Sequence, residues 1–361
     1  MAFPRKKRRP LRSLLTALLF IVAYFLLFPY PLGRELVAVP RWAVALPAAS
    51  APGSAAPGGP VAPFQVGNRF GYVQGDGTIV YCGTVLYRVA LSSSAFVNFS
   101  RLGTDWIVQD PAGRRLMSFS GSGYPLVSPD GRRLFTVKTD LSGLQERDRN
   151  GDTAWDRDFP TMMTSLSVQG DLVLVGLLDG SLHLLNREGS PVFDVTPGGS
   201  RIPVVVGCAL SPDGARLAAV TGIDPQYLVV MAREGAAFSP VMRTPLPGTF
   251  RREVRIGFSP GSRLLFLEGT AGPGLLEATG GAVRWLPLHG VLAGAAFPHQ
   301  GRAAAFAARD GSVGRLLIEP AAGSPVSREE FPAHDLFVGT IEGQLLLGLD
   351  GQLLRIDVEE M

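Results

Sequence analysis

The stretches that decide the fold of this chain are VSPDGRRLFTV at residues 127–137 and LSPDGARLAAV at residues 210–220. In both, a Ser-Pro-Asp-Gly turn separates an apolar residue from an apolar run. Proline suits the first corner of a turn, and Asp-Gly supplies the left-handed residue that ends it. Related stretches are FSPGSRLLFLE at 258–268 and FPHQGRAAAFA at 297–307. All four predict hairpins whose two strands face a core.

A second turn pattern recurs between these hairpins, in which a strand, a polar turn with glycine and another strand follow one another. Spacings of 38, 38, 46, 46 and 42 residues separate its turn glycines, which are Gly113, Gly151, Gly189, Gly235, Gly281 and Gly323. Repeats of about 40–50 residues with four short strands each are typical of β-propellers. The pattern therefore predicts a ring of similar blades.

The chain ends suggest how the ring closes. Residues 335–358 supply three strands of a repeat without a fourth, and residues 85–99 are predicted to provide the missing outer strand. A shared blade removes the open sheet edge that would invite aggregation. We therefore predict an all-β, seven-bladed β-propeller of four-stranded blades. Residues 64–84 hold an extra hairpin-like stretch, so eight blades are the alternative.

The N-terminal region has a different composition. Residues 13–28 carry no charge, and with the residues up to 32 they approach the ~20 that cross a bilayer as a helix. The apolar run is longer than that of a cleaved signal peptide, which is the alternative. We predict one transmembrane signal anchor at 13–32, after a basic cytoplasmic tail at 1–12. A Pro/Ala/Gly-rich linker at 33–63 then leads to the propeller domain at 64–361, and residues 33–46 within it are ambiguous. The predicted location is the inner membrane, with the propeller in the periplasm.

The turns resemble those of known families. The Ser-Pro-Asp-Gly hairpins resemble WD40-like and TolB-like propellers. The turns from Gly151 to Trp155 and from Gly281 to Trp285 resemble the tryptophan-docking turns of PQQ-like repeats. The similarity covers about residues 70–358, and it departs from WD40 repeats because no Trp-Asp dipeptide ends a third strand. The chain thus resembles a bacterial WD40-like/PQQ-like β-propeller repeat protein with an N-terminal membrane anchor.

Charge and cysteines limit the function classes. Six of the positive charges lie in residues 1–12, so the net charge of +3 becomes −3 for the remainder. A nucleic-acid-binding domain needs a basic face of its own, and we therefore expect no nucleic-acid partner. Cys82 and Cys208 match no metal-binding or redox spacing, although a disulfide between them remains open.

One acidic run offers a weak candidate for a calcium site. Asp148, Asn150 and Asp152 alternate as calcium ligands do at the start of a loop. The sixth loop position holds Thr153 rather than glycine, and the twelfth holds Phe159 rather than glutamate. The run also occupies the position of a repeat turn. We therefore favour an ordinary turn and predict neither a metal nor a cofactor.

Two loops are the candidate contact sites. Residues 221–226 lengthen one repeat with Asp224 and Gln226, and a basic cluster of Arg251, Arg252 and Arg255 opens the next. Propeller faces are built from loops, which suits recognition. Since no catalytic motif is present, we expect a non-catalytic scaffold that binds cell-envelope proteins. The alternatives are an enzyme that binds a small molecule or a quinone cofactor in the central channel, and a sensor that signals through a partner.

Overall fold

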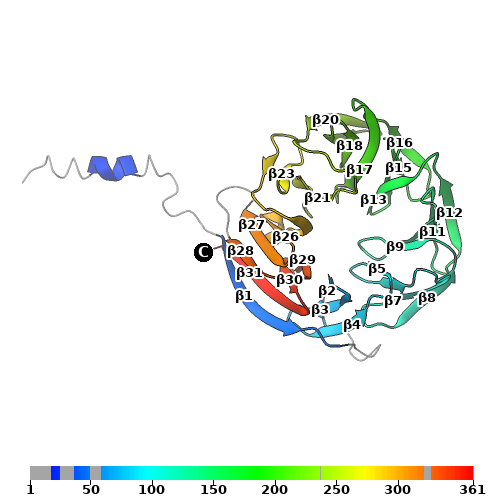
Figure 1. Cartoon of the computed structure of the whole chain (residues 1–361), viewed down its shortest axis with the longest axis horizontal. Helices are drawn as coiled ribbons and strands as arrows, with labels where there is room; N and C mark the ends of the chain where they lie inside the picture. The colour runs from blue at the N-terminus through cyan, green and yellow to red at the C-terminus, as the bar shows by residue number, and fades with distance from the viewer. Residues whose placement is uncertain (1–17, 25–35, 49–57, 236, 321–326, 361) are drawn as a thin grey trace, which may run out of the picture. The chain divides into compact units, whose positions relative to one another are not determined.

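The computed structural model describes residues 18–24, 36–48, 58–235, 237–320 and 327–360. The chain divides into two units, residues 1–36 with 360–361 and residues 37–359. In the first unit, residues 18–24 are helical. The second unit is a ring of β-sheets, which Figure 1 shows face-on.

The ring contains eight sheets, which we number as blades in chain order. Blade 1 consists of β2 (Val61–Val66), β3 (Arg69–Gln74) and β4 (Ile79–Thr84). Blade 2 consists of β5 (Arg88–Leu91), β6 (Phe96–Phe99), β7 (Asp105–Gln109) and β8 (Arg115–Ser120). Blade 3 consists of β9 (Tyr124–Val127), β10 (Leu134–Val137), β11 (Gly143–Arg147) and β12 (Thr153–Asp158). Blade 4 consists of β13 (Met163–Gln169), β14 (Leu172–Leu177), β15 (Leu182–Leu185) and β16 (Pro191–Val195).

The second half of the ring continues in the same way. Blade 5 consists of β17 (Ile202–Leu210), β18 (Arg216–Ile223), β19 (Tyr227–Glu234) and β20 (Ala237–Pro245). Blade 6 consists of β21 (Ile256–Phe258), β22 (Leu264–Leu267), β23 (Gly274–Glu277) and β24 (Arg284–Trp285). Blade 7 consists of β25 (Val291–Ala296), the 3-10 turn η1 (His299–Gly301), β26 (Ala303–Asp310), β27 (Val313–Pro320) and β28 (Ser327–Pro332). Blade 8 consists of β29 (Leu336–Ile341), β30 (Gln344–Leu349), β31 (Gln352–Glu360) and β1 (Leu36–Ala45).

The all-β propeller is confirmed, but the prediction of seven blades is wrong, because the structure has eight. The additional blade is the sheet of β2, β3 and β4, which contains the hairpin-like stretch behind the eight-bladed alternative. It has three strands in the described part of the chain, whereas the other sheets have four. Residues 85–99 do not complete the last blade, since they include β5 and β6 of blade 2.

Strand β1 closes the ring instead, pairing with β31 as the outermost strand of blade 8 (Figure 1). It lies within the range predicted as a linker. Its alternate residues Trp42 and Val44 pack on the core between blades 8 and 1, as the two-residue period of a strand requires. The Trp42 indole donates a hydrogen bond to Gly75 O at 2.8 Å, and Arg41 pairs with Asp357 of β31 at 2.9 Å.

The prediction of a membrane-spanning helix at 13–32 is wrong for the part of this range that the structure describes. A short helix covers residues 18–24, and no helix in the described ranges has the length and apolar character needed to cross a membrane. The predicted single-pass inner-membrane location depended on this helix and is corrected with it. The predicted tail at 1–12, and residues 13–17 and 25–32 of the anchor, lie outside the described residues.

The four Ser-Pro-Asp-Gly-type turns form hairpins, as predicted, and each joins the first strand of a blade to its second strand. In blade 3, Gly131 N donates to Ser128 O at 2.8 Å, and Arg133 N donates to Ser128 Oγ at 2.9 Å. Blade 5 repeats both bonds through Ser211. Asp130 Oδ1 also accepts from Arg132 N at 3.1 Å, and Asp213 Oδ1 from Ala215 N at 3.0 Å. The serine and the aspartate thus satisfy backbone groups that the turn would otherwise leave unpaired.

The second set of turns joins the third strand of a blade to its fourth. Gly113, Gly151, Gly189, Gly235 and Gly281 all have positive φ values there, while Gly323 lies outside the described residues. The Trp155 ring packs under Gly189 of the next blade, where a Cβ would lie 2.5 Å from it. At Gly151 the nearest atom is the Cβ of Phe119 rather than its ring, 2.8 Å from where a Cβ of Gly151 would lie. Trp285 instead packs against Gly269 and Gly274, so tryptophan docking is not uniform around the ring.

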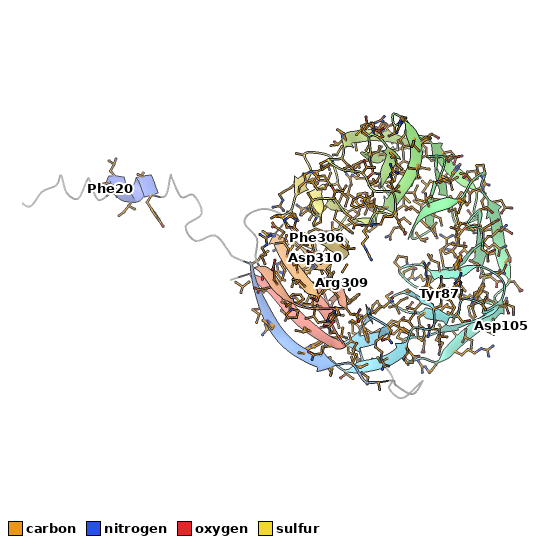
Figure 2. The ribbon with its side chains drawn as sticks, viewed as in Figure 1. Phe20, Tyr87, Asp105, Phe306, Arg309 and Asp310 are labelled. Carbon is orange, nitrogen blue, oxygen red and sulfur yellow. The ribbon has the colours of Figure 1, made fainter. Side chains whose placement is uncertain are left out.

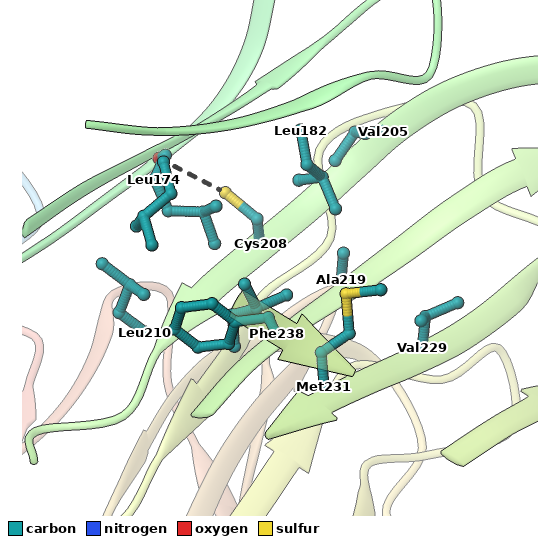
Figure 3. Close-up of a cluster of buried hydrophobic side chains, with 11 residues drawn as sticks. Leu174, Leu182, Val205, Cys208, Leu210, Ala219, Val229, Met231 and Phe238 are labelled. Carbon is teal, nitrogen blue, oxygen red and sulfur yellow. Dashed lines mark hydrogen bonds between the residues drawn. The ribbon is translucent and has the colours of Figure 1, made fainter. Parts of the chain in front are cut away.

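The core lies between adjacent blades. Figure 3 shows it between blades 4 and 5, where Leu174, Leu182 and Phe238 surround Cys208. The Cys208 thiol donates to Leu174 O at 3.7 Å, and burial raises the pKa of this thiol to about 12. Phe306 on β26, labelled in Figure 2, is fully buried between blades 6 and 7. Cys82 and Cys208 are both buried and free.

The loops alternate between two faces of the ring because neighbouring strands are antiparallel. From β2 onward, the described loops from an odd-numbered to the next even-numbered strand lie on one face, which we call the turn face because it carries the Ser-Pro-Asp-Gly turns. Loops from an even-numbered to the next odd-numbered strand lie on the opposite face. On the turn face, hydrogen bonds link neighbouring blades: Ser94 Oγ donates to Asp130 O at 2.9 Å, Arg133 to Gly170 O at 3.2 Å, and His299 N to Gly343 O at 2.6 Å.

Candidate partner-binding face

The face opposite the turn face carries most of the exposed large apolar side chains of the ring, and we call it the apolar face. Outside the short helix, eleven large apolar side chains are exposed among the described residues. Seven belong to loops or strand starts of this face: Leu86, Tyr87, Leu102, Met162, Leu178, Ile202 and Val291. The other four lie within strands, namely Ile107, Leu116, Val192 and Val241. Large apolar groups that gather on one face mark an interaction surface more strongly than scattered ones do.

A groove opens in the apolar face between the inner strands of blades 2 and 3. Its volume is about 500 Å³, and its lining includes Tyr87, Val89, Tyr124, Leu126 and Leu141. Tyr87, labelled in Figure 2, is 40% exposed at the start of β5. The Arg88 guanidinium lies 5.6 Å from the centre of the Tyr87 ring. The groove can accept an apolar side chain beside one cation.

The predicted contact loop at 221–226 belongs to the apolar face, between β18 and β19. Asp224 is exposed there and pairs with Arg201 at 3.1 Å. Gln226 is only 1% exposed. Its side-chain nitrogen donates to Gly222 O at 3.0 Å and to Phe250 O at 3.1 Å, and its oxygen accepts from Phe250 N at 3.1 Å. Gln226 therefore fastens two loops together rather than pointing to a partner.

The predicted basic cluster lies in the loop between β20 and β21, on the same face. Arg251 is exposed. Arg252 makes two hydrogen bonds to Glu268, at 3.0 and 2.6 Å, and these bonds raise the pKa of its guanidinium. Arg255 lines a cavity at the inner strands, so the three arginines do not form one patch. The hydrogen bonds between Gln226 and Phe250 hold this loop next to residues 221–226.

The cavity that Arg255 lines has a volume of about 370 Å³ and includes Glu253, Ser165 and Cys208. Burial is the main cause that raises the pKa of Glu253, and Arg255 and Arg88 oppose it. Glu253 is the single carboxylate of the described lining, and no His appears in it. The lining thus contains one candidate acid or base for the small-molecule alternative.

The calcium candidate occupies the turn between β11 and β12, as its place in the repeat indicated. Asp148 Oδ1 accepts hydrogen bonds from Asn150 N at 2.8 Å and from Asp152 N at 2.9 Å. This oxygen is already used to hold the turn. No group of three potential metal-binding side chains is found among the described residues.

Sequence reasoning missed the apolar residues of this face. Leu102 lies in Arg-Leu-Gly-Thr and Leu178 in Leu-Leu-Asp-Gly, where each apolar side chain stands inside a turn rather than in an alternating strand. A large apolar residue inside a turn is a sequence feature that could have predicted this exposure, because a turn seldom buries a large side chain. Their gathering on one face follows only from the order of strands around the ring.

Comparison with known proteins places the fold in context. An uncharacterized protein of Treponema pallidum (strain Nichols) is 24% identical over 348 residues, which cover 94% of this chain and 92% of that protein. Among solved structures, BamB from Moraxella catarrhalis has a TM-score of 0.58 at 16% identity, covering 89% of this chain and 100% of that one. A chain of the Mitotic Checkpoint Complex has a TM-score of 0.54 at 15% identity, covering 76% of this chain and 96% of that one.

The computationally designed Ika8 protein is also similar, with a TM-score of 0.59 at 13% identity, covering 91% of this chain and 100% of that chain. At these identities the structural matches establish the fold alone. A family model described as beta-propeller protein matches residues 4–361, nearly the whole chain. The eight sheets, their order and this match agree, and the chain belongs to this family of beta-propeller proteins.

Proposed function

We propose that this protein is a non-catalytic scaffold that binds a partner protein through its apolar face. The observation that carries the proposal is the unequal exposure of apolar groups: seven large side chains are exposed on this face, and none of the eleven described ones lies in a loop of the turn face. Burying such side chains is the main favourable term in most protein association.

The partner presents at least one apolar side chain, which enters the groove between blades 2 and 3. Tyr87 lines the groove and is 40% exposed. Leu86, the residue before it, is 68% exposed, and Leu102 of the next loop on this face is 91% exposed. A tyrosine beside a pocket is a typical anchor position of an interface. The exposed leucines add apolar area that a partner can bury. The solved Mitotic Checkpoint Complex supports the proposal, since a chain of the same fold is part of an assembly there. The expectation that the partners are cell-envelope proteins stays a prediction without the membrane helix.

The test compares two double variants of the full chain. Leu86→Glu with Leu102→Glu places two charges on the apolar face, whereas Val192→Glu with Val241→Glu places two charges at exposed positions of β16 and β20. Quantitative crosslinking in the source cells, followed by mass spectrometry, should recover a protein with the natural chain and the second variant, but not with the first. Equal recovery by both variants contradicts the proposal.

A second copy of the chain is the occupant that must be distinguished from a partner. Sedimentation of the purified natural chain measures self-association directly. A monomer supports a separate partner. A dimer that the Leu86 and Leu102 substitutions dissociate would show that the apolar face joins two copies, and it would overturn the proposal of a separate partner.

A further inference from the structure

A larger groove lies on the turn-face side of blade 3, where blades 2, 3 and 4 meet. Its volume is about 850 Å³. Strands β7 and β8 of blade 2 form one wall, and the turns after β9, β11 and β15 form the other parts (Figure 1). The groove is separate from the apolar face, so its function does not depend on the proposal above.

The floor of this groove is apolar. Val108, Leu134 and Val127 are 5%, 6% and 8% exposed at its base. Leu116 is 57% exposed, and it is one of the few large apolar side chains exposed outside the apolar face. The floor therefore offers contact for an aliphatic side chain that enters the groove.

The rim of the groove is strongly basic. Five arginines and two carboxylates line it: Arg132, Arg133, Arg147, Arg149, Arg187, Glu146 and Asp148. Arg187 also pairs with Asp171, outside this lining, at 2.7 Å, so an excess of two positive charges remains. The chain from residue 13 to its end has a net charge of −3. The groove therefore has the opposite sign to the rest of that region, and positive potential gathers there.

Both carboxylates of the lining are already engaged. Glu146 accepts two hydrogen bonds from Arg133, at 2.9 and 2.6 Å, and one from the Trp155 indole at 2.6 Å. Asp148 accepts the two backbone bonds of its own turn. These groups are therefore poorly placed to neutralise the other arginines of the rim.

Three guanidinium groups remain open to an anion. Arg132 has an 85% exposed side chain, and the nearest carboxylate oxygen, from Asp130, is 3.9 Å away. Arg149 is exposed. Arg147 bonds only uncharged groups, Thr153 Oγ1 and Gln145 Oε1, both at 2.8 Å, and its buried Nε has no hydrogen-bond partner among the described residues. Guanidinium groups match carboxylates in shape and charge.

We infer that this groove binds an acidic segment of a partner protein, with carboxylates on the arginine rim and an aliphatic side chain on the apolar floor. Charge complementarity selects the acidic segment, since a basic or neutral one leaves the excess charge unmatched. The one aromatic side chain of the lining, Trp155, packs against Gly189 and donates to Glu146, and the floor is otherwise aliphatic. This favours a peptide over a nucleic acid, whose bases stack on exposed aromatic rings.

The test measures the binding of fluorescently labelled peptides to the full chain. The probes are short synthetic peptides in which leucine alternates with glutamate, serine or lysine, together with a single-stranded oligonucleotide. We expect the glutamate–leucine peptide to bind most tightly, with an affinity that falls as salt rises. Arg132→Glu with Arg149→Glu should weaken it about tenfold or more, because two attractive contacts become repulsive.

The matched control is Arg233→Glu with Arg263→Glu, which makes the same charge change at exposed positions near the turn face of blades 5 and 6. It should leave the affinity within about twofold of the natural chain. Circular dichroism checks that both variants are folded. The inference is overturned by equal binding of the three peptides, by equal loss in both variants, by an oligonucleotide that binds as tightly, or by the absence of peptide binding.

Discussion

The ring of Trp155 in blade 3 lies directly under Gly189 in the turn of blade 4, so closely that a Cβ on Gly189 would be 2.5 Å from the indole. The indole nitrogen donates to Arg187 O of the same turn at 3.0 Å. Because Gly189 also has a φ of +74°, both space and backbone conformation require glycine. One contact thus fixes the distance between two blades.

We predict that Gly189→Ala destabilises the propeller by about 2–4 kcal/mol. The left-handed backbone costs about 1–2 kcal/mol for alanine, and the overlap with Trp155 adds about 1–2 kcal/mol. Gly235 is the matched control, since it occupies the same turn in blade 5 with a φ of +66° and no atom near its Cβ position. Urea unfolding should show a clearly smaller loss for Gly235→Ala, and equal losses would contradict the importance of the contact.

Substitution of Gln226 should loosen the two loops that it joins on the apolar face. Gln226→Ala leaves the partly buried Phe250 N–H and carbonyl groups without their partner, at a cost of about 1–3 kcal/mol. Hydrogen exchange of the Phe250 amide should become faster, while exchange in β26 stays unchanged. The exposed Gln65 serves as control, and Gln65→Ala should alter neither. Continued protection of the Phe250 amide in Gln226→Ala would refute this role.

Acid should destabilise the propeller partly through Asp350. Backbone hydrogen bonds from Asp335 N at 2.7 Å and His334 N at 2.8 Å hold the pKa of Asp350 below its ordinary value. The folded-state pKa is therefore below that of the unfolded chain, near 3.9. The resulting stabilisation is complete above the unfolded-state pKa and is lost as the pH falls through the folded-state pKa.

Asp350→Asn should accordingly lose less stability on acidification than the natural chain does. The asparagine oxygen still accepts both hydrogen bonds, but it does not titrate. Melting temperatures measured from neutral pH to about pH 3 should converge for the two proteins as the pH falls. Parallel curves over this whole range would show that Asp350 contributes nothing to acid sensitivity.

Both cysteines should be unreactive in the folded protein. Burial raises the pKa of Cys82 as well as that of Cys208, and the thiolate is the reactive form. A maleimide added at neutral pH should label neither residue in native protein and both in urea, as mass spectrometry would report. Rapid native labelling of Cys208 would contradict the burial of its thiol.

The repeating turns made the propeller predictable from sequence, because Ser-Pro-Asp-Gly and the spaced glycines each mark a fixed place in a blade. The number of blades was not predictable in the same way. Blade 1 has no Ser-Pro-Asp-Gly turn, and its glycine turn at Gly75–Gly77 was not counted among the repeats, so the count omitted this blade. Strand β1 was not predicted because Pro40 interrupts its sequence pattern and a Pro/Ala/Gly-rich stretch separates it from β2.

The candidate face was predictable only in part. The loops that contain Asp224 and Arg251 stand out in sequence as longer or more charged than their neighbours, and both lie on the apolar face. Gln226 is buried because its loop meets the loop that contains Phe250. The residues around Gln226 in the sequence do not indicate this contact. The basic groove likewise combines residues from three blades, and the single turn at Asp148–Asp152 gave no indication of it.

Ring closure by β1 also has a consequence for biosynthesis. The last blade combines residues 36–45 with residues 336–360, so nearly the entire chain must leave the ribosome before this sheet can form. Until then β1 lacks its partner strand β31, and an unpaired strand is prone to aggregate. Strand β1 therefore needs protection from the time it is made until β31 has followed it.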